Sequence, residues 1–416
     1  MSELVTKCES AKSAAQKLIN VSATEKNSAL IAIADALIKR TDEILSANQI
    51  DIDNAKNNGT REAMIDRLTL TPERIKGISD GVREVATLND PIGEVINMTQ
   101  RPNGLMIGKK RVPMGVIGII YEARPNVTVD AAVLCLKTSN ACVLRGGSEA
   151  INSNVAIMRI MQEAAYSCGI PKGTLNIIED TSRETATALM RMNGYIDMLI
   201  PRGGKGLIRS VVENATVPVV ETAAGNCHVY VDEFADLDMA TKIVLNAKVQ
   251  RPSVCNAAET LLIDGKIADR FIPVIFKKLI DKNVEIRADE MSKSIYSDGV
   301  ISATDEDYYT EYNDYIIAVK VVNGVSEAIE HINKYNTKHS EAIITDSYEN
   351  AQKFLNEVDA AAVYVNASTR FTDGFEFGFG AEIGISTQKM HARGPMGLEA
   401  LTSVKYVVYG SGQIRG

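Results

Sequence analysis

The residue best suited to nucleophilic chemistry is Cys255, which lies in the segment Lys-Val-Gln-Arg-Pro-Ser-Val-Cys-Asn-Ala-Ala-Glu-Thr at 248–260. The segment is polar and interrupted by proline, so it predicts a loop between a helix and a strand. A thiol reacts where water and substrate reach it and where nearby cations or dipoles favour the thiolate. The other five cysteines lie in apolar or regular stretches, which are typical of small buried side chains. Cys255 is therefore predicted to be a catalytic nucleophile.

A glycine-rich turn at 200–206 (Ile-Pro-Arg-Gly-Gly-Lys-Gly) follows a predicted strand and opens a predicted helix. Backbone N–H groups at a helix start bind anions, and glycine lets a phosphate come close. Arg202 and Lys205 add positive charge beside Gly203 and Gly204. The turn indicates a phosphate or dinucleotide cradle. The alternative is a turn that only connects the strand to the helix, because the string is not Gly-x-Gly-x-x-Gly.

A second turn, Leu-Arg-Gly-Gly-Ser-Glu at 144–149, also stands at the end of a predicted strand. Arg145 in this turn could meet a 2′-phosphate, which would favour NADP over NAD. A surface arginine on a glycine turn explains the same string equally well, so both interpretations stay open at this point.

Two polar residues at strand ends could take part in catalysis. Asn126 ends the string Tyr-Glu-Ala-Arg-Pro-Asn, where Pro125 stops a strand and a helix begins. Its side chain could cap that helix, or its amide could donate to a developing oxyanion. Glu221 ends a predicted strand before a glycine turn and could act as a general base or proton shuttle. The alternative for Glu221 is a solvated carboxylate.

The elements that position these residues begin with helices over the first ninety residues. The spacing of Ser22 and Glu25 predicts a capping box, and Thr71-Pro72 predicts a second helix start. Two extended arms, 94–98 and 105–112, then flank Asn103-Gly104, a strong hairpin-turn signal.

From residue 115 onward, short apolar strands alternate with helices, which predicts parallel sheets covered on both faces and hence an α/β fold with two units. The predicted strands are 115–121, 141–144, 174–178, 196–200, 218–221, 228–231, 260–263, 316–322, 342–345, 361–365 and 404–409. The predicted helices are 126–137, 148–168, 183–190, one from 205, 267–280, 326–335 and 347–358.

Composition excludes several classes of function. A chain of 416 residues is long enough for two or more domains. Its net charge of -8 gives no indication of a positively charged surface for binding nucleic acid. No apolar run approaches a membrane span, and the N-terminus lacks the blocks of a signal peptide. Six scattered cysteines indicate free thiols in the cytoplasm, and the four histidines show no metal-ligand spacing.

The order of these motifs (amide, arginine turn, glycine cradle, carboxylate, cysteine) is more informative than any one of them. It resembles the aldehyde dehydrogenase superfamily. The strings at 112–128, 250–256, 322–343 and 380–399 resemble, within it, the γ-glutamyl phosphate reductase family, also called glutamate-5-semialdehyde dehydrogenase. The resemblance covers nearly the whole chain.

The resemblance implies two Rossmann-like α/β domains and a small β oligomerisation arm. We expect an NADPH-binding domain over 1–225, with 366–400 returning near it and 94–112 as the hairpin arm. A catalytic domain carrying Cys255 is expected over 226–365, and an oligomerisation strand over 401–416.

The resemblance also implies roles for single residues. Cys255 would be the nucleophile, Asn126 and the Cys255 backbone N–H would serve the oxyanion, and Glu221 would match the general-base position. Glu311 matches the glutamate that holds the nicotinamide ribose, although the following Asn313-Asp314 departs from the common Phe-Gly-Pro. The expected contacts to the NADPH phosphates are Arg145, Gly146, Ser148, Arg202, Gly203, Gly204 and Lys205. The expected contacts to the glutamyl α-carboxylate or the leaving phosphate are Arg124, Arg370, His391 and Arg393.

The activity that follows is NADPH-dependent reduction of L-glutamyl 5-phosphate to L-glutamate 5-semialdehyde and phosphate through a cysteinyl thioester. This is the second step of proline biosynthesis from glutamate. A homo-oligomer and a transient contact with glutamate 5-kinase are expected partners. The alternatives are an oxidising aldehyde dehydrogenase that hydrolyses its thioester and a non-catalytic scaffold that kept the fold.

Overall fold

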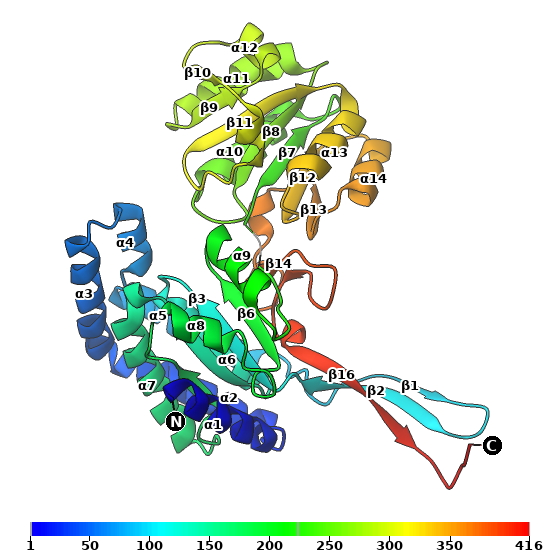
Figure 1. Cartoon of the computed structure of the whole chain (residues 1–416). Helices are drawn as coiled ribbons and strands as arrows, with labels where there is room; N and C mark the ends of the chain where they lie inside the picture. Colours follow the sequence, from blue (N-terminus) through cyan, green and yellow to red (C-terminus); the bar gives the residue numbers. More distant parts are fainter. Residues whose placement is uncertain (1, 223, 416) are drawn as a thin grey trace. The chain divides into compact units, whose positions relative to one another are not determined.

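The structure of the protein, a computed structural model, describes residues 2–222 and 224–415, which fold as two compact units (Figure 1). Unit 1 comprises Met1–Thr222, Gly378–Gly384 and Met396–Gly416. Unit 2 comprises Ala223–Phe377 and Ile385–Pro395. The segment 366–400, expected to return near the first domain, is shared between the units. Residues 366–377 stay with unit 2 because their turn is hydrogen-bonded to the loop that carries Cys255.

Five helices open unit 1, as the sequence predicts. They are α1 (Glu3–Leu18), α2 (Ala23–Lys39), α3 (Thr41–Asn57), α4 (Glu62–Leu68) and α5 (Pro72–Thr87). The predicted capping box is confirmed, since Ser22 accepts from the Glu25 backbone and Glu25 accepts from the Ser22 backbone. Thr71 caps α5, with Pro72 at the first helical position. Each cap satisfies backbone N–H groups that a helix start leaves without a partner.

A four-stranded parallel sheet in the order β5-β4-β3-β6 forms the centre of unit 1. Its strands are β3 (Val116–Tyr121), β4 (Ala141–Gly146), β5 (Leu175–Ile177) and β6 (Met198–Arg202). The connections run through α6 (Pro125–Lys137), η1 (Ser148–Ala150) with α7 (Ile151–Ser167), and α8 (Arg183–Leu189), and α9 (Lys205–Asn214) follows β6. Apolar residues of α1, α8 and α9 pack on one face of this sheet, and α6 and α7 also pack against it.

The predicted strand at 218–221 is reduced to one bridge between Leu199 and Val219. Pro218 has no N–H to donate, so the ladder of hydrogen bonds cannot continue through it.

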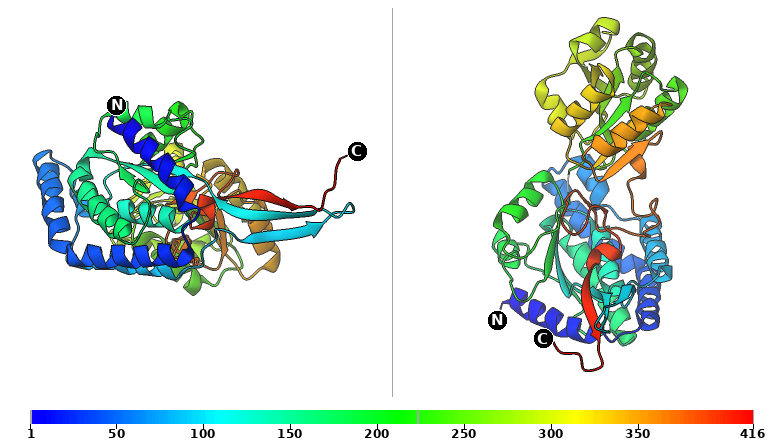
Figure 2. Two further views of the ribbon diagram at one scale, coloured as in Figure 1. Left: turned by 90° about the horizontal axis from the view of Figure 1, so that it is seen from below. Right: turned by 90° about the vertical axis from the view of Figure 1, so that its right-hand side faces the viewer.

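A three-stranded antiparallel arm extends from the rest of unit 1 (Figure 2). It pairs β1 (Val95–Gln100) with β2 (Met106–Pro113), and β2 with β16 (Thr402–Tyr409). The predicted Asn103-Gly104 turn is confirmed, and Gly104 takes the positive φ of 86° that favours glycine. Both outer strands expose apolar side chains, which are Val95, Ile96, Met98, Val404, Tyr406, Val408 and Tyr409.

Unit 2 is built on a seven-stranded parallel sheet in the order β10-β9-β11-β8-β7-β12-β13. Its strands are β7 (Cys227–Val231), β8 (Ala258–Asp264), β9 (Glu285–Ala288), β10 (Val300–Ser302), β11 (Ile316–Val322), β12 (Ser340–Ile344) and β13 (Ala362–Val365). Its helices are α10 (Leu237–Val249), α11 (Ala268–Ile280), α12 (Glu290–Ile295), α13 (Gly324–Tyr335) and α14 (Tyr348–Glu357), and a short pair, β14 (Ile385–Ser386) with β15 (Gly394–Pro395), joins unit 2 late in the chain. The sequence patterns did not reveal β9, α12 or β10.

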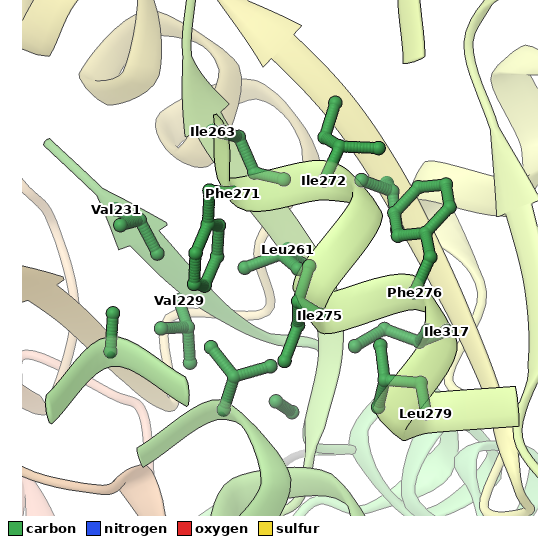
Figure 3. Close-up of a cluster of buried hydrophobic side chains, with 14 of the residues drawn as sticks. Val229, Val231, Leu261, Ile263, Phe271, Ile272, Ile275, Phe276, Leu279 and Ile317 are labelled. Carbon is green, nitrogen blue, oxygen red and sulfur yellow. The ribbon is translucent and has the colours of Figure 1, made fainter. Parts of the chain in front are cut away.

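The core of unit 2 lies where α11 covers β7, β8 and β11 (Figure 3). Phe271, Ile275 and Leu279 point from the helix onto the sheet. Burying each such side chain stabilises the fold by about 1.5–3 kcal/mol. This packing fixes the start of β8, directly after the loop that carries Cys255.

Across the described residues, no helix combines the length and the apolar character that a membrane crossing needs. No group of three or more histidine, cysteine or acidic side chains in the same residues is arranged to hold a metal ion. All six cysteines are free thiols, as predicted.

Candidate active site

Cys255 lies, half-buried, in a loop between the end of α10 and the start of β8, as the sequence predicts. A turn closed by the Ala257 N–H on the Val254 carbonyl, at 3.0 Å, surrounds it. Of the other five thiols, four are buried and Cys168 is half-buried at the end of α7. Cys255 therefore combines partial exposure with a loop position, which a reactive thiol needs.

A close backbone approach holds this loop from the side of β7. A Cβ added to Gly225 would lie 1.4 Å from the Cys255 carbonyl oxygen, so only glycine fits there. The Cys227 thiol lies 3.2 Å from the same oxygen and donates to it. The Gly225 N–H donates to Glu311 Oε1 at 2.7 Å. The structure thus brings Glu311, the predicted ribose contact, to the backbone beside the nucleophile loop.

The turn at Thr369–Phe371 locks the other side of the loop. The Asn256 amide donates to the carbonyls of Arg370 (3.2 Å) and Thr372 (3.0 Å), and the Thr369 hydroxyl donates to the Asn256 carbonyl at 2.7 Å. Arg370 donates in return to Asn256 Oδ1, and its Nε donates to Gln250 Oε1 at 3.0 Å. Arg370, predicted to contact substrate, therefore lies against the residue that follows the nucleophile.

A buried ion pair ties the two elements that flank the loop. Lys248 on α10 and Glu259 on β8 are fully buried, with Nζ and Oε2 2.5 Å apart. Burial raises the pKa of Glu259 to about 7, against the lowering effect of Lys248. The Asn313 N–H donates to the other Glu259 oxygen at 3.1 Å. Removing one partner would leave an unpaired buried charge, so the pair holds both ends of the loop in register.

In unit 1, Asn126 does not cap α6, because the cap position is Arg124 and Asn126 stands in the first turn. The capping interpretation is therefore wrong. The Asn126 amide instead donates to Asp130 Oδ2 at 3.1 Å, one turn along the helix. Burial raises the pKa of Asp130 to about 6, although the Asn126 hydrogen bond and the charge of Arg202 act to lower it. One of the two amide hydrogens is thus held by Asp130, which fixes how the other points.

The predicted phosphate cradle forms the start of α9, with Gly204 at the cap position and no side-chain cap. Gly203, Gly204 and Lys205 are exposed there. The Gly204 N–H donates to Glu122 Oε2 at 2.8 Å, so a carboxylate already satisfies one donor of this helix start. A helix start with exposed backbone N–H groups is a place where an anion such as a phosphate can bind. Sequence reasoning missed Glu122, whose contact joins residues 82 positions apart.

The Arg145 guanidinium, predicted to meet a 2′-phosphate, already has hydrogen-bond partners within the chain. It donates to the backbone carbonyls of Thr181 and Ser182, the second at 3.1 Å, and burial lowers its pKa. Gly146 beside it has no room for a side chain, because a Cβ would lie 2.3 Å from Asn154 Nδ2. Ser148 is exposed at the start of η1. Arg145 therefore uses some of its N–H donors to hold the loop before α8.

The remaining predicted residues lie elsewhere on their units. Glu221 is half-buried near the end of the first stretch of unit 1. Arg393 forms an ion pair with Asp359 at 2.6 Å. Lys389 and Lys338 join it, and hydrogen bonds from Lys389 first, then Arg393, hold the pKa of Asp359 at about 2. His391 is exposed, with a positive φ of 67°. The charge of Arg393 is thus already compensated.

Comparison with known proteins covers the whole chain. A sequence profile described as the aldehyde dehydrogenase family matches residues 2–314. The chain is similar to proteins named gamma-glutamyl phosphate reductase from Caldicellulosiruptor bescii (61% identical over 418 residues) and Clostridium beijerinckii (62% over 415 residues), with 100% of each chain covered. A crystal structure of gamma-glutamyl phosphate reductase from Thermotoga maritima has a TM-score of 0.97, with 52% identity and 100% of both chains covered.

Proposed function

Because the chain belongs to the aldehyde dehydrogenase family and, within it, to the γ-glutamyl phosphate reductases, we propose that it reduces L-glutamyl 5-phosphate with NADPH through a thioester on Cys255. Its fold is the predicted aldehyde-dehydrogenase-like α/β fold, and the enzyme is an oxidoreductase. The products are L-glutamate 5-semialdehyde and phosphate, the glutamate-to-semialdehyde step of proline biosynthesis. The observation that carries the thioester proposal is one half-buried cysteine on a loop clamped by Gly225 and Asn256.

The Cys255 sulfur attacks the acyl carbon of the acyl phosphate, and the carbon–oxygen bond to phosphate breaks. A thioester accepts hydride more readily than a carboxylate does, so this covalent step prepares the carbonyl for reduction. Bound NADPH supplies the hydride. The clamp on the loop supports this role, because a nucleophile must be held within a fraction of an ångström of its attack position.

Asn126 is assigned to the oxyanion that forms at the reacting carbonyl, together with the Cys255 backbone N–H. Its hydrogen bond to Asp130 supports the assignment, since a donor fixed before reaction stabilises developing charge best. Asn126→Ala should lower turnover by about 10²–10³-fold. A loss below about threefold would show that the amide does not serve the reaction.

NADPH is assigned to the cradle at the start of α9 and to the turn at the end of β4. Gly203, Gly204 and Lys205 would face its pyrophosphate, with Arg202 and Arg145 nearby and Glu311 for the nicotinamide ribose. The exposed helix start supports this fit. Preference for NADPH over NADH is tested by comparing kcat/KM for the two cofactors in the wild type and in Arg145→Ala, which should lose the preference.

Arg370, Arg124, His391 and Arg393 are proposed to contact the substrate. Arg370 is the best supported, because it donates to Asn256, the residue that follows the nucleophile. Glu221 is given no step, because water activation would hydrolyse the thioester and waste the acyl group. If this is correct, Glu221→Gln should leave phosphate-dependent turnover and the release of free glutamate unchanged. An oxidising aldehyde dehydrogenase would instead depend on Glu221 for its turnover.

We also infer that the arm pairs with a second copy of the chain. Both edge strands of the three-stranded arm present unpaired backbone groups and exposed apolar side chains, which favour pairing with another chain. Light scattering at micromolar concentration should give a multiple of 45.1 kDa. Tyr406→Asp with Val408→Asp should reduce that mass, whereas a monomeric wild type would remove the inference.

The decisive assay runs the reaction backward. The wild type should oxidise glutamate 5-semialdehyde with NADP only when phosphate is present, and it should act poorly on succinate and aspartate semialdehydes. Cys255→Ser should lose nearly all turnover and keep NADPH binding. Phosphate-independent oxidation would favour a hydrolytic aldehyde dehydrogenase, and no oxidation at all would favour a non-catalytic scaffold.

A further inference from the structure

Two arginines belong to the immediate surroundings of the nucleophile in unit 2. Arg370 donates to Asn256, the residue after Cys255, and to Gln250, the residue before Arg251. Against the lowering effect of burial, the charge of Cys255 raises the pKa of Arg370, and the like charge of Arg251 lowers it. Within the described residues, neither arginine forms an ion pair with a carboxylate. Arg251 on the loop and Arg370 on the adjoining turn are thus two cations on the segments that surround Cys255, without a described carboxylate in salt-bridge contact.

The donor set of Arg370 is only partly used. A guanidinium carries five N–H donors, and the described contacts of Arg370 engage Nε, with Gln250, and Nη1, with Asn256. Nη2 donates to none of the described residues. The two bonds fix the plane of the guanidinium, so its remaining donors are oriented before an anion arrives.

Keeping two like charges together is unfavourable without an anion between them. Burial lowers the pKa of Arg370, and the charge of Arg251 lowers it further. Asp373 opposes this effect, but it forms no ion pair with Arg370 among the described contacts. A bound dianion would relieve the repulsion and use the free donors, because guanidinium groups bind phosphate oxygens bidentately.

We propose that Arg251 and Arg370 form the binding site of the phosphate group that leaves the acyl carbon. This inference rests on the proposed function and specifies which end of the substrate the nucleophile loop holds. The Cys255 sulfur bonds to the acyl carbon, the electron pair of the carbon–oxygen bond leaves with phosphate, and the thiol proton ends on that phosphate. No oxidant or reductant is needed at this step.

The position of the two arginines distinguishes phosphate from the α-carboxylate. The leaving phosphate is bonded through one oxygen to the carbon that the sulfur attacks, so it must pass beside the thiol. The α-carboxylate lies four carbon–carbon bonds away, about 5 Å in an extended chain. One cation on the nucleophile loop and one on the turn hydrogen-bonded to it therefore match the phosphate end.

Kinetics of the backward reaction test the assignment, because phosphate and semialdehyde are separate substrates there. Arg251→Ala and Arg370→Lys should each raise KM for phosphate about tenfold and leave KM for glutamate 5-semialdehyde within about twofold, since each removes one charge or one bidentate contact. Arg251→Ala carries little risk to folding, because Arg251 is exposed. Arg270→Ala, an exposed arginine on α11 in the same unit, is the matched control and should change neither constant.

A second readout does not depend on turnover. Inorganic phosphate should protect Cys255 of the wild type from iodoacetamide, and sulfate at equal ionic strength should protect it less. Arg251→Ala and Arg370→Lys should lose the protection, and Arg270→Ala should keep it.

A selective rise in KM for semialdehyde would overturn the inference in favour of the α-carboxylate. Unchanged KM for phosphate in an active enzyme, with protection retained, would also overturn it and leave the proposed function standing. A wild type without phosphate-dependent oxidation would overturn the proposed function and this inference together.

Discussion

Replacing Gly225 by alanine should disable the nucleophile loop without touching any reactive group. The added Cβ would lie 1.4 Å from the Cys255 carbonyl oxygen, 2.3 Å from its carbonyl carbon and 2.6 Å from its Cα. All three are backbone atoms, so no side-chain rotation relieves the overlap. Restoring ordinary contact near 3.5 Å requires the two segments to separate by about 2 Å.

The expected cost follows from that displacement. A misplacement of about 1 Å at a reacting group can lower turnover by about 10²-fold, so Gly225→Ala should lose at least that much. Overpacking of this kind should also cost about 3 kcal/mol of folding stability. The variant should keep the contribution to NADPH binding that the proposed cradle in unit 1 makes. It should also disturb Glu311, whose Oε1 accepts from the Gly225 N–H at 2.7 Å.

Three measurements separate these effects: phosphate-dependent oxidation of glutamate 5-semialdehyde, NADPH binding by fluorescence, and the rate of Cys255 alkylation by iodoacetamide. Gly77→Ala is the matched control, since Gly77 is exposed in α5 and its Cβ would meet nothing within 4 Å. That substitution should stabilise the fold by about 0.5–1 kcal/mol and leave turnover unchanged. A folded Gly225→Ala protein with more than a third of wild-type turnover and an unchanged alkylation rate would refute the reasoning.

Two other predictions follow from charges in unit 1. Glu122→Gln should tighten NADPH binding about three- to tenfold in a fluorescence titration, because it keeps the acceptor for the Gly204 N–H and removes an exposed negative charge from the cradle; weaker binding would mean that the carboxylate contacts the cofactor favourably. Asp130→Asn should stabilise the protein at high pH, because the folded-state pKa of Asp130 is raised to about 6. A raised carboxyl pKa means that the folded protein holds a proton which the unfolded chain has released, so wild-type stability falls as pH rises from about 4 to about 6. The advantage of Asp130→Asn should therefore grow by about 2 kcal/mol between pH 4 and pH 8 in denaturation experiments, and an advantage independent of pH would contradict the assigned pKa.

Much of the fold could be predicted from the sequence, because its signals are local. Short apolar strands alternating with helices identified both parallel sheets, and the caps at Ser22 and Thr71 marked helix starts. The pattern failed where elements are short: β9, α12 and β10 span three to six residues each, too few to show a repeating pattern of apolar residues. It also overstated 218–221, where Pro218 interrupts the ladder.

The position of Cys255 in a polar loop could be predicted from the sequence, but the residues that hold this loop in place could not. The loop around Cys255 could be predicted because the segment is polar and contains a proline. The residues that hold the loop did not, because Gly225, Asn256 and Arg370 meet only through tertiary packing across as many as 114 positions. Asn126 illustrates the same limit, since its partner Asp130 became evident only when the helix start was located at Arg124.

The central claim is that one sulfur atom carries the glutamyl group before reduction. Mass spectrometry of a quenched backward reaction, with glutamate 5-semialdehyde and NADP but no phosphate, measures this directly. We expect a glutamyl adduct on the peptide that contains Cys255, and its disappearance when phosphate is added. Normal phosphate-dependent turnover with no adduct on that peptide, or an adduct that persists in Cys255→Ser, would contradict it.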